Sequence, residues 1–321
     1  MPFEQDNFRR DSGRGAMDGH SALVFGATGQ QGGAVAAALR AKGWVVRALV
    51  RNPDGDKAQA LATTGVIPMR GDFSDDRSIR DAMAGVHSVF SVQPSSGQGA
   101  AYGVSDAQEI RYGKRVADLA VETGVQHLVY SSIDVAGAEK TGMGHFDSKL
   151  EIEAHIRSLD LRSTIVRPTG FMELMMLPGM GLDRDCFTFF LRPDQSIQTI
   201  AVHDIGKIVA AIFQQPDRYA GRTIEMAGDE VTGNDLQVSL SRAAGKAIRY
   251  HRFPDSLLEQ NPFLAQLAAL VDNGRLAGSA DIAALKQEFG GLLNLDAWLD
   301  GPGKPLLRAA LETADAAVAL R

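Results

Sequence analysis

The sequence predicts an α/β fold, in which a doubly wound parallel sheet is followed by a smaller, mainly helical C-terminal part. Three observations predict it. Short apolar, β-branched runs alternate with alanine-rich helical stretches through the first half, which is typical of a parallel sheet covered on both faces. A glycine-rich string directly follows the first expected strand. The alternation loosens after Pro168, and the chain from Asp255 onward has helical patterns with glycine breaks.

The first half supplies six expected strands with a helix between each consecutive pair. The expected strands are Ser21–Phe25, Val45–Val50, Val66–Met69, His87–Val92, His127–Ser131 and Ser163–Arg167. The expected helices are Gln31–Ala41, Asp56–Thr63, Asp75–Ala84, Ser105–Thr123 and Phe146–Ser158. Because crossovers between parallel strands are right-handed, these elements predict one sheet with helices on both faces.

Beyond Pro168 the pattern is less regular. The expected elements there are a helix at His203–Gln214, a strand at Arg222–Met226, a helix at Thr232–Ala244 and a strand at Ile248–Phe253. Thr232 and Asp235 have the spacing of a capping box, which marks the start of a helix. We therefore predict a core domain over residues 20–168 and a smaller domain over residues 169–321, partly interleaved with the core.

Composition narrows the classes of function. The net charge of −6 argues against direct nucleic-acid binding, because neutralising phosphates requires a basic face. The single cysteine, Cys186, excludes an internal disulfide and fits a reducing, cytoplasmic location. A lone cysteine of this kind is a packed side chain, with a redox thiol as the alternative. We expect a monomer or a homodimer.

Neither a membrane segment nor a metal site is expected. No apolar run approaches the roughly 18 residues that a membrane span needs. Residues 1–19 are polar and glycine-containing, lack the apolar stretch of a signal peptide, and are interpreted as a flexible tail. The histidines and the cysteine show no ligand spacing, so no metal is expected.

The glycine string predicts a dinucleotide site. It has the Rossmann context, because it follows an expected strand and opens an expected helix. In such a loop one glycine allows the tight turn, one lets the backbone approach the pyrophosphate, and one lets the helix pack closely on the strand. The helix then presents free amides to the phosphates. The expected contacts are Gly26, Ala27, Thr28, Gly29, Gln30, Gln31 and Gly32.

The end of the second strand favours NADP(H) over NAD(H). An NAD site usually carries Asp or Glu there to hold the ribose 2′-hydroxyl, whereas this chain has Arg51 and Asn52. A guanidinium can bind a 2′-phosphate bidentately, and Lys57 is a second candidate cation. The alternative is that Arg51 only points to solvent. The nearby carboxylates of Asp54 and Asp56 weaken the preference.

Further cofactor contacts are expected where other strands end, because ligands of open parallel sheets bind at the carboxyl ends of the strands. Asp72 and Phe73 follow the third strand and are candidates for the adenine end. Residues after the fourth and sixth strands are candidates for the ribose, diphosphate and nicotinamide. These residues are Val92, Gln93, Pro94, Pro168 and Phe171. The methionines at 172, 175, 176 and 180 form either an adaptable apolar surface or ordinary core.

Together these residues resemble the NmrA-like family of atypical short-chain dehydrogenase/reductases, and most closely its HSCARG-type NADPH-sensor branch. The similarity spans roughly residues 21–300. The matching segments are Phe25–Gly33, Arg51–Pro53, Gly71–Asp72, Val129–Ser132, His145–Lys149, Val166–Pro168, Phe171–Glu173 and Leu292–Leu299. The resemblance implies NADP(H) binding and a Rossmann fold with a small C-terminal domain. Some members of the family reduce small molecules, and others report the NADP(H) ratio to a protein partner.

The catalytic apparatus departs from the standard pattern. Standard short-chain reductases place Tyr and Lys four residues apart on one helix, so that both lie on the same face. Here that spacing gives His145 and Lys149. Lys149 is a candidate contact of the nicotinamide ribose, and His145 is either a proton donor or a residue that orients the helix. Ser131 or Ser132, at the end of the fifth strand, is a candidate substrate-binding hydroxyl or satisfies local backbone groups.

The missing tyrosine leads to two hypotheses. The first is an NADP(H)-binding redox sensor or regulator that is read by a protein partner. The second is an NADPH-dependent reductase of a quinone, a carbonyl or a similar small molecule, which the retained Lys149 supports. Neither hypothesis involves nucleic acid or a membrane.

Overall fold

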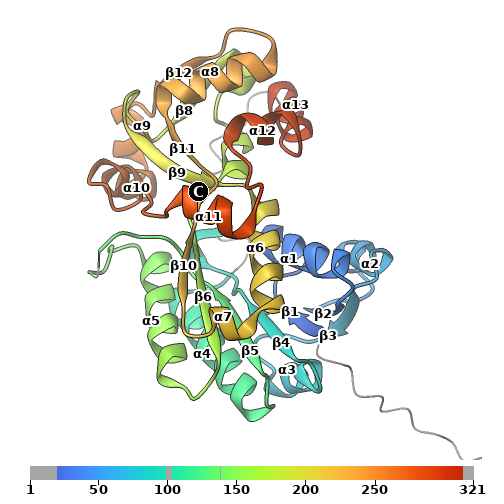
Figure 1. Cartoon of the computed structure of the whole chain (residues 1–321). Helices are drawn as coiled ribbons and strands as arrows, with labels where there is room; N and C mark the ends of the chain where they lie inside the picture. Colours follow the sequence, from blue (N-terminus) through green and yellow to red (C-terminus); the bar gives the residue numbers. More distant parts are fainter. Residues whose placement is uncertain (1–19, 99–102, 138, 314–321) are drawn as a thin grey trace, which may run out of the picture.

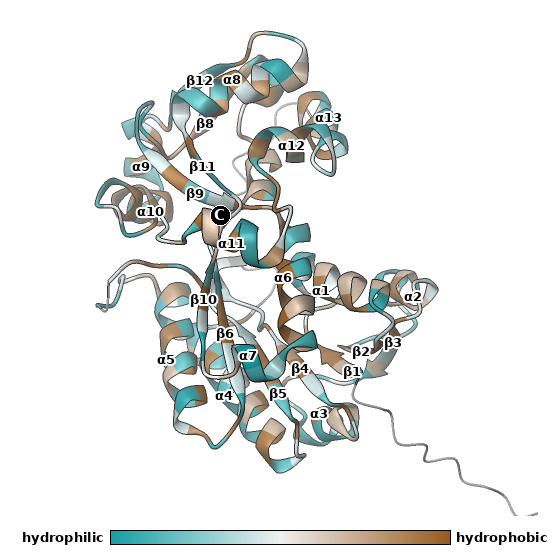
Figure 2. Ribbon diagram, in the orientation of Figure 1, coloured by the Kyte–Doolittle hydropathy of each residue, from teal (hydrophilic) through white to brown (hydrophobic). Residues whose placement is uncertain are grey.

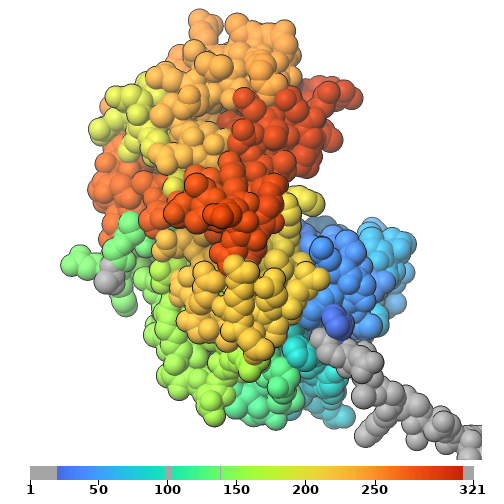
Figure 3. All heavy atoms as spheres, viewed as in Figure 1, coloured from blue at the N-terminus to red at the C-terminus, as the bar shows by residue number. Residues whose placement is uncertain are grey.

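The computed structural model describes residues 20–98, 103–137 and 139–313, which form two lobes (Figure 1). The lower lobe contains a seven-stranded sheet, and the upper lobe contains two small sheets and most of the later helices. In the space-filling view the surface is indented where the red C-terminal helices face the blue N-terminal ones (Figure 3). The expected flexible tail, residues 1–19, lies outside the described residues.

The large sheet has the strand order β10-β6-β5-β4-β1-β2-β3, and every neighbouring pair is parallel. Its strands are β1 Ser21–Val24, β2 Val45–Val50, β3 Ile67–Arg70, β4 Ser88–Ser91, β5 His127–Ser131, β6 Ser163–Pro168 and β10 Thr223–Met226. The predicted α/β fold with a parallel sheet is therefore confirmed. The strand order reverses between β1 and β4, and ligands of such sheets bind outside the strand ends at that point.

Helices cover both faces of this sheet. One face carries α1 Gln30–Ala41, α2 Asp56–Thr63, α6 Val202–Gln214 and α7 Pro216–Tyr219, and the other carries α3 Asp76–Met83, α4 Asp106–Glu122 and α5 Gly144–Ser158. Side chains alternate between the two cores, because Ala22 and Val24 face one and Leu23 faces the other. Figure 2 shows apolar residues gathered on the inner strands and on α6.

The second half of the chain contributes to the sheet lobe as well as to the upper lobe. Helices α1 and α6 pack so closely that a Cβ on Gly206 would lie 2.5 Å from the carbonyl carbon of Ala34. Strand β10 extends the sheet beside β6, and α11 Ile282–Phe289 packs on the same core. The chain therefore returns to the sheet lobe twice after Pro168. Its division into separate domains at that residue stays a prediction.

The upper lobe combines short strands with helices. Its elements are β7 Gly170–Phe171, β8 Cys186–Phe189, β9 Ser196–Ile200, β11 Asp229–Thr232, β12 Arg249–Arg252, α8 Gly233–Ala244, α9 Asp255–Gln260, α10 Pro262–Asp272, α12 Leu295–Asp300, α13 Lys304–Glu312 and the 3-10 turns Met172–Met176 and Leu182–Arg184. The predicted strand near Ile248 is present as β12, whereas β8, β9 and β11 were not predicted. Thr232 and Asp235 form the expected capping box.

The methionine-rich segment fills the core of the upper lobe. Met172, Met175, Met176 and Met180 are between 0% and 8% exposed and pack in one cluster with Trp298. Unbranched, polarisable side chains suit an irregular interior of this kind. Of the two alternatives left open by the sequence, the structure therefore shows core filling rather than an exposed apolar surface.

A strap over residues 275–280 ties the two lobes together. The amide of Ala136, beyond β5, donates to the carbonyl of Arg275 at 2.9 Å, and the amide of Gln198 in β9 donates to that of Ala277 at 2.7 Å. The side chain of Gln198 also accepts from the amide of Ala280 at 2.9 Å. These bonds come from both lobes, so the strap restrains one lobe relative to the other.

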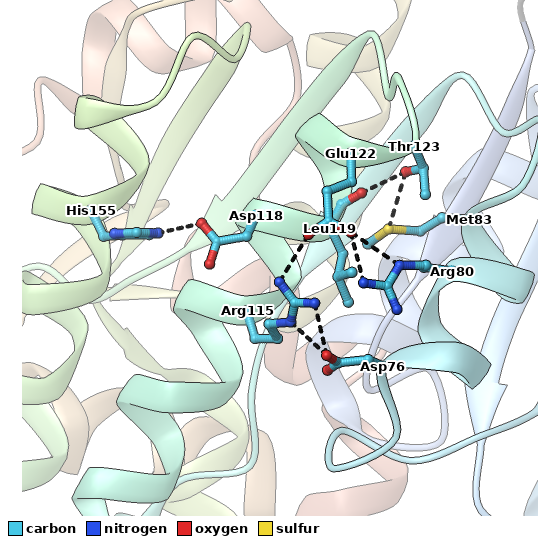
Figure 4. A network of polar contacts seen from close by, with 9 residues as sticks. All are labelled: Asp76, Arg80, Met83, Arg115, Asp118, Leu119, Glu122, Thr123 and His155. Carbon is cyan, nitrogen blue, oxygen red and sulfur yellow. Dashed lines mark hydrogen bonds and ion pairs between the residues drawn. The ribbon is translucent and has the colours of Figure 1, made fainter.

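Ion pairs on the outer face of α3 and α4 stabilise the helix layer (Figure 4). Arg115 forms ion pairs with Asp76 at 2.7 Å and with Glu122 at 3.0 Å. Glu122 also forms an ion pair with Arg80 at 2.7 Å. Hydrogen bonds from Arg115 lower the pKa of Asp76, and those from Arg80 lower the pKa of Glu122. Because these side chains are partly exposed, each pair adds only a small amount to stability.

A buried histidine at the start of β5 makes stability depend on pH. Thr164 donates its only hydroxyl proton to the carbonyl of Tyr219 at 2.8 Å, so it must accept from His127 Nε2 at 2.9 Å. His127 Nε2 therefore carries a proton, and the lowered pKa of the ring keeps it neutral at pH 7. Burial lowers the pKa of His127 to about 4, and the charges of Arg162 and His87 add to this effect.

We expect this histidine to destabilise the protein in acid. Between about pH 6.5 and 4 the unfolded chain binds a proton on His127 that the folded chain does not, so stability falls as pH decreases through that window. The full effect is about 3 kcal/mol. Urea unfolding at pH 7, 5.5 and 4.5 measures it. Between pH 7 and 4.5 the decline in stability should be shallower in His127→Gln by about 2 kcal/mol, and an identical pH dependence in the two proteins would contradict this assignment.

Candidate functional site

The loop between β1 and α1 requires glycine for its shape. Gly26 has a φ of 65°, and its carbonyl accepts from the amide of Gly29 at 2.9 Å, which closes a tight turn. A Cβ on Gly32 would lie 2.6 Å from the carbonyl oxygen of Phe25 and even closer to the carbonyl of Gly26. The first turn of α1 therefore lies directly against the turn that precedes it.

The N-terminus of α1 presents unused hydrogen-bond donors. In the described part of the chain, the amides of Gln30, Gln31 and Gly32 donate to no other backbone group, and no side chain caps the helix. Its first turn contains no acidic residue. Free amides and the positive end of the helix dipole together form a site for an anion such as a phosphate.

A hollow of about 320 Å³ lies beside this loop. Its walls are Ala27, Thr28, Lys57, Ala60 and Leu61, so it lies between the glycine loop and α2. The side chain of Lys57 is exposed at the rim. The hollow is open to solvent, and a phosphate or ribose in it would meet the loop on one side and a cation on the other.

Arg51 lies at the carboxyl end of β2, exposed, and donates to no acceptor among the described residues. The neighbouring Asp54 is bonded by Arg70 at 3.1 Å, and Asn52 accepts from the Asp54 amide at 3.2 Å. Asp56 is the first residue of α2, where a carboxylate is favoured by the helix dipole. Asp54 is thus paired with Arg70, and Asp56 lies at the N-terminus of α2. Neither carboxylate pairs with Arg51 in the described part of the chain, so its guanidinium can bind a ligand.

The turn after β3 is ordered by its own contacts. Asp72 accepts from the amide and the hydroxyl of Ser74, and these bonds, with the charge of Arg51, lower the pKa of Asp72. The ring of Phe73 stacks on Phe25 at 5.2 Å and on Tyr112 at 5.5 Å. Phe73 is therefore held between the glycine loop side of the sheet and α4 by two stacked rings.

The ends of β4 and β5 lie next to the glycine loop. Val92 fills the space beside Gly26, where a Cβ would be 2.9 Å from Val92 Cγ1. Gln93 is buried and donates to Ser91 at 2.7 Å, and Pro94 follows it, half-buried. Ser131 donates to the side chain of Gln31 at 2.6 Å, so the end of β5 is joined to the first turn of α1.

The His145–Lys149 pair lies at the start of α5, which begins at Gly144, two residues earlier than predicted. The ring of His145 is half-buried, with its centroid 4.0 Å from that of Phe146 and 5.4 Å from that of Phe263 in α10. A Cβ on Gly97 would lie 2.6 Å from His145 Cδ2. The imidazole is thus packed between α5, the loop after β4 and the upper lobe.

Lys149 is paired with a carboxylate that the sequence did not single out. Its ammonium donates to Glu109 of α4, and the two side chains are 15% and 1% exposed. In the expected helix Ser105–Thr123, Glu109 occupies the apolar stripe with Gly113, Val116 and Ala120. Glu109 could therefore have been recognised in the sequence as the acidic residue on the apolar face of an expected helix.

A second set of polar residues that the sequence analysis did not single out comes from β6, α5 and the loop after β5. Arg167 forms two bonds with the buried Glu153 at 2.9 and 2.7 Å, and the amide of Ser279 in the strap donates to Asp134 at 3.2 Å. Burial raises the pKa of Asp134, and nearby Glu225 adds to the rise. The bond between Asp134 and Ser279 thus adds a contact between the sheet lobe and the strap.

Pro168 and Phe171 complete the row of predicted residues. Pro168 ends β6 and its carbonyl accepts from the amide of Asp134 at 3.1 Å, while half-buried Phe171 lies in β7 and packs on the sheet core. Because all seven strands of the large sheet are parallel, the candidate residues that follow these strands lie along one edge, with the glycine loop at its centre. Their individual roles stay predictions.

Among residues 20–98, 103–137 and 139–313, no group of three or more His, Cys, Asp or Glu side chains is placed to hold a metal ion. None of the helices in the same part of the chain combines the length and the apolar character that crossing a membrane requires.

The chain belongs to the NmrA-like family, whose model matches residues 20–287. A relative in Dictyostelium discoideum, an NmrA-like family domain-containing protein, is 29% identical over 246 residues, covering 71% of this chain and 78% of the relative. The family predicted from the sequence is confirmed, and the HSCARG-type branch stays a prediction.

Solved structures share the fold. The transcriptional regulator NmrA, solved in complex with NADP, superposes with a TM-score of 0.73 at 22% identity, covering 90% of this chain and 97% of that one. NmrA has also been solved with NAD. The triphenylmethane reductase of Citrobacter sp., solved with NADP(H), gives a TM-score of 0.73 at 22% identity, covering 87% of this chain and 99% of the reductase.

Proposed function

We propose that this protein binds NADP(H) at the edge of the sheet and acts as a cytoplasmic redox sensor that a protein partner reads. The glycine loop and the free amides of α1 would bind the diphosphate, and Arg51 with Lys57 the 2′-phosphate. The NADP complexes of NmrA and of the triphenylmethane reductase support a cofactor in this place. The resemblance to HSCARG-type sensors supports the regulatory role.

The observation that carries the sensor proposal is the environment of His145. Standard short-chain reductases have a tyrosine at this position as the proton donor. Here the position holds an imidazole that packs on Phe146 and on Phe263 of the upper lobe. Its contacts connect the helix that carries Lys149 to α10. A conformational change at the nicotinamide end of the cofactor would therefore reach the surface of the upper lobe through side chains that pack directly on one another.

A reductase is the second candidate, favoured by one observation. Lys149 is retained four residues after His145 and is held in place by a buried carboxylate, as a contact of the nicotinamide ribose would need to be. The structural likeness to a triphenylmethane reductase agrees with this candidate. Its substrate would be a small quinone, carbonyl or similar acceptor of a hydride.

One experiment separates the two candidates. The purified chain is given NADPH and a panel of quinones and aldehydes, and the absorbance of the reduced nicotinamide is followed. The sensor proposal predicts no turnover, together with NADPH-dependent protection of α10 amides from hydrogen exchange that is lost in His145→Ala. Turnover that disappears in Lys149→Ala but persists in Lys114→Ala would favour the reductase and contradict the sensor.

A further inference from the structure

Helices α4 and α5 run side by side in the same direction and are joined by three pairs of polar side chains, which we call the α4–α5 ladder. Its rungs are Glu109–Lys149, Lys114–Glu151 at 2.6 Å and Asp118–His155 at 2.7 Å, the last of which is visible in Figure 4. Between the first two rungs the helices touch closely, because a Cβ on Gly113 would lie 2.5 Å from Ile152 Cδ1.

The first rung differs from the other two in burial. The side chains of Glu109 and Lys149 are 1% and 15% exposed, whereas those of Lys114 and Glu151 are 33% and 50% exposed. Exposed pairs of that kind add little to stability. A buried pair costs much desolvation energy, and well-packed apolar residues of similar size are often as stabilising or more so. Helix packing alone therefore gives no reason for a charged pair at the first rung.

Glu109 is also incompletely satisfied. One carboxylate oxygen accepts from Lys149, and the other, Oε2, is buried and has no hydrogen-bond partner in the part of the chain that the structure describes. Leaving a buried acceptor unpaired is unfavourable by roughly 1–3 kcal/mol. Residues that carry such a cost are found where a site needs a fixed charge.

The ammonium of Lys149 has capacity for further contacts. It carries three donors, and Glu109 uses one of them. Lysine has a flexible four-carbon stem, so a free ammonium would have no defined position. Lys149 lies in the second turn of α5, and α5 starts at the edge of the sheet that carries the glycine loop. The Glu109 carboxylate holds the ammonium there, and within the part of the chain that the structure describes no other acceptor uses its remaining donors.

We propose that Glu109 is a positioning residue that fixes the Lys149 ammonium for the nicotinamide ribose of the bound cofactor. The inference rests on the proposed binding of NADP(H). Glu109 touches neither cofactor nor substrate, and it acts only through Lys149. Removing its charge while keeping its shape leaves the ammonium unpaired and mobile, so the cofactor loses an organised contact.

The test uses two probes and calorimetry on the full chain. NADPH contains the nicotinamide ribose, whereas adenosine 2′,5′-bisphosphate contains only the adenosine half with its two phosphates. Glu109→Gln is expected to weaken NADPH binding about tenfold, which is the loss of roughly one charge-assisted hydrogen bond, and to leave the bisphosphate affinity unchanged. Glu151→Gln, which removes a carboxylate from the next rung, is the matched control and should change neither affinity.

A double variant separates positioning from a structural role. Glu109→Gln combined with Lys149→Met removes both charges, so it folds without an unpaired buried ion. If Glu109 acts through Lys149, this variant binds NADPH as Lys149→Met alone does. Three results would each overturn the proposal. In Glu109→Gln, the affinities for both probes could fall equally, or NADPH could bind as tightly as to the unmodified chain or more tightly. The double variant could also bind NADPH more weakly than Lys149→Met alone. Failure of the proposed function is a different result, in which the unmodified chain binds neither probe.

Discussion

Replacing Gly32 with alanine is expected to weaken NADPH binding by at least about 100-fold, or about 3 kcal/mol. The added Cβ would lie 2.6 Å from the carbonyl oxygen of Phe25 and closer still to the Gly26 carbonyl. These neighbours are backbone atoms that cannot rotate away, so α1 must move away from the turn. Its free amides then no longer point at one phosphate position. Calorimetric titration with NADPH measures the loss.

The neighbouring glycine supplies the matched control. A Cβ on Gly33 would lie 3.2 Å from the carbonyl oxygen of Ala27, which a shift of a few tenths of an ångström relieves. Gly33→Ala should therefore bind NADPH within a few-fold of the unmodified chain. Thermal melts of both variants show that the titrations are made on folded protein. Near-normal NADPH affinity in folded Gly32→Ala would show that the close approach of α1 to the turn is not needed for binding.

Arg51→Ala is expected to weaken NADPH binding about 100-fold while changing NADH binding less than about threefold. The magnitude corresponds to loss of a bidentate bond between guanidinium and phosphate. Because Arg51 is exposed and donates to no protein acceptor among the described residues, its removal should leave the melting temperature unchanged. The ratio of the two affinities, measured by titration at fixed ionic strength, isolates the role of the 2′-phosphate.

A second surface arginine controls for net charge. Arg77 lies in α3 with a side chain that is 91% exposed, and Arg77→Ala removes the same charge from a residue that is not a candidate contact of the cofactor. It should lower NADPH affinity less than twofold. If Arg51→Ala reduced NADPH and NADH binding equally, the 2′-phosphate would have another partner, and the preference for NADP(H) would lose its physical basis.

Local patterns predicted most of the sheet lobe. Helix α2 begins and ends where expected, at Asp56 and Thr63, and β2 and β5 also match residue for residue. These elements have regular periodicity and clear boundaries. Helix α5 starts earlier than expected because Asp147, in its first turn, accepts from the amides of Thr141 and Gly142 and folds the preceding loop back onto the helix.

The sequence was less informative where the structure depends on distant partners. A strand was predicted at Arg222–Met226 and is present as β10 Thr223–Met226, but its place beside β6 in the large sheet follows from packing that no local pattern encodes. Strands β8, β9 and β11 are only four or five residues long, and β8 lies in the methionine- and glycine-rich segment. Their pairing partners are supplied only by the folded upper lobe.

The candidate site likewise contains residues that a local pattern predicts and contacts that only the folded chain shows. The glycine loop and Arg51 could be predicted because neighbouring residues define each of them. The pairing of Lys149 with Glu109 spans 40 residues, and the contact of His145 with Phe263 joins different lobes. Such contacts depend on how α4, α5 and α10 pack, so the lysine and the histidine could be predicted from their spacing, whereas their partners could not.

If the glycine loop and Arg51 form a dinucleotide site, the unmodified chain must bind NADPH. Isothermal titration calorimetry on the purified protein should show saturable binding of one NADPH per chain, with a dissociation constant in the micromolar range or below, and weaker binding of NADH. A flat titration with both NADPH and NADP⁺, on protein shown to be folded, would contradict the account of this site.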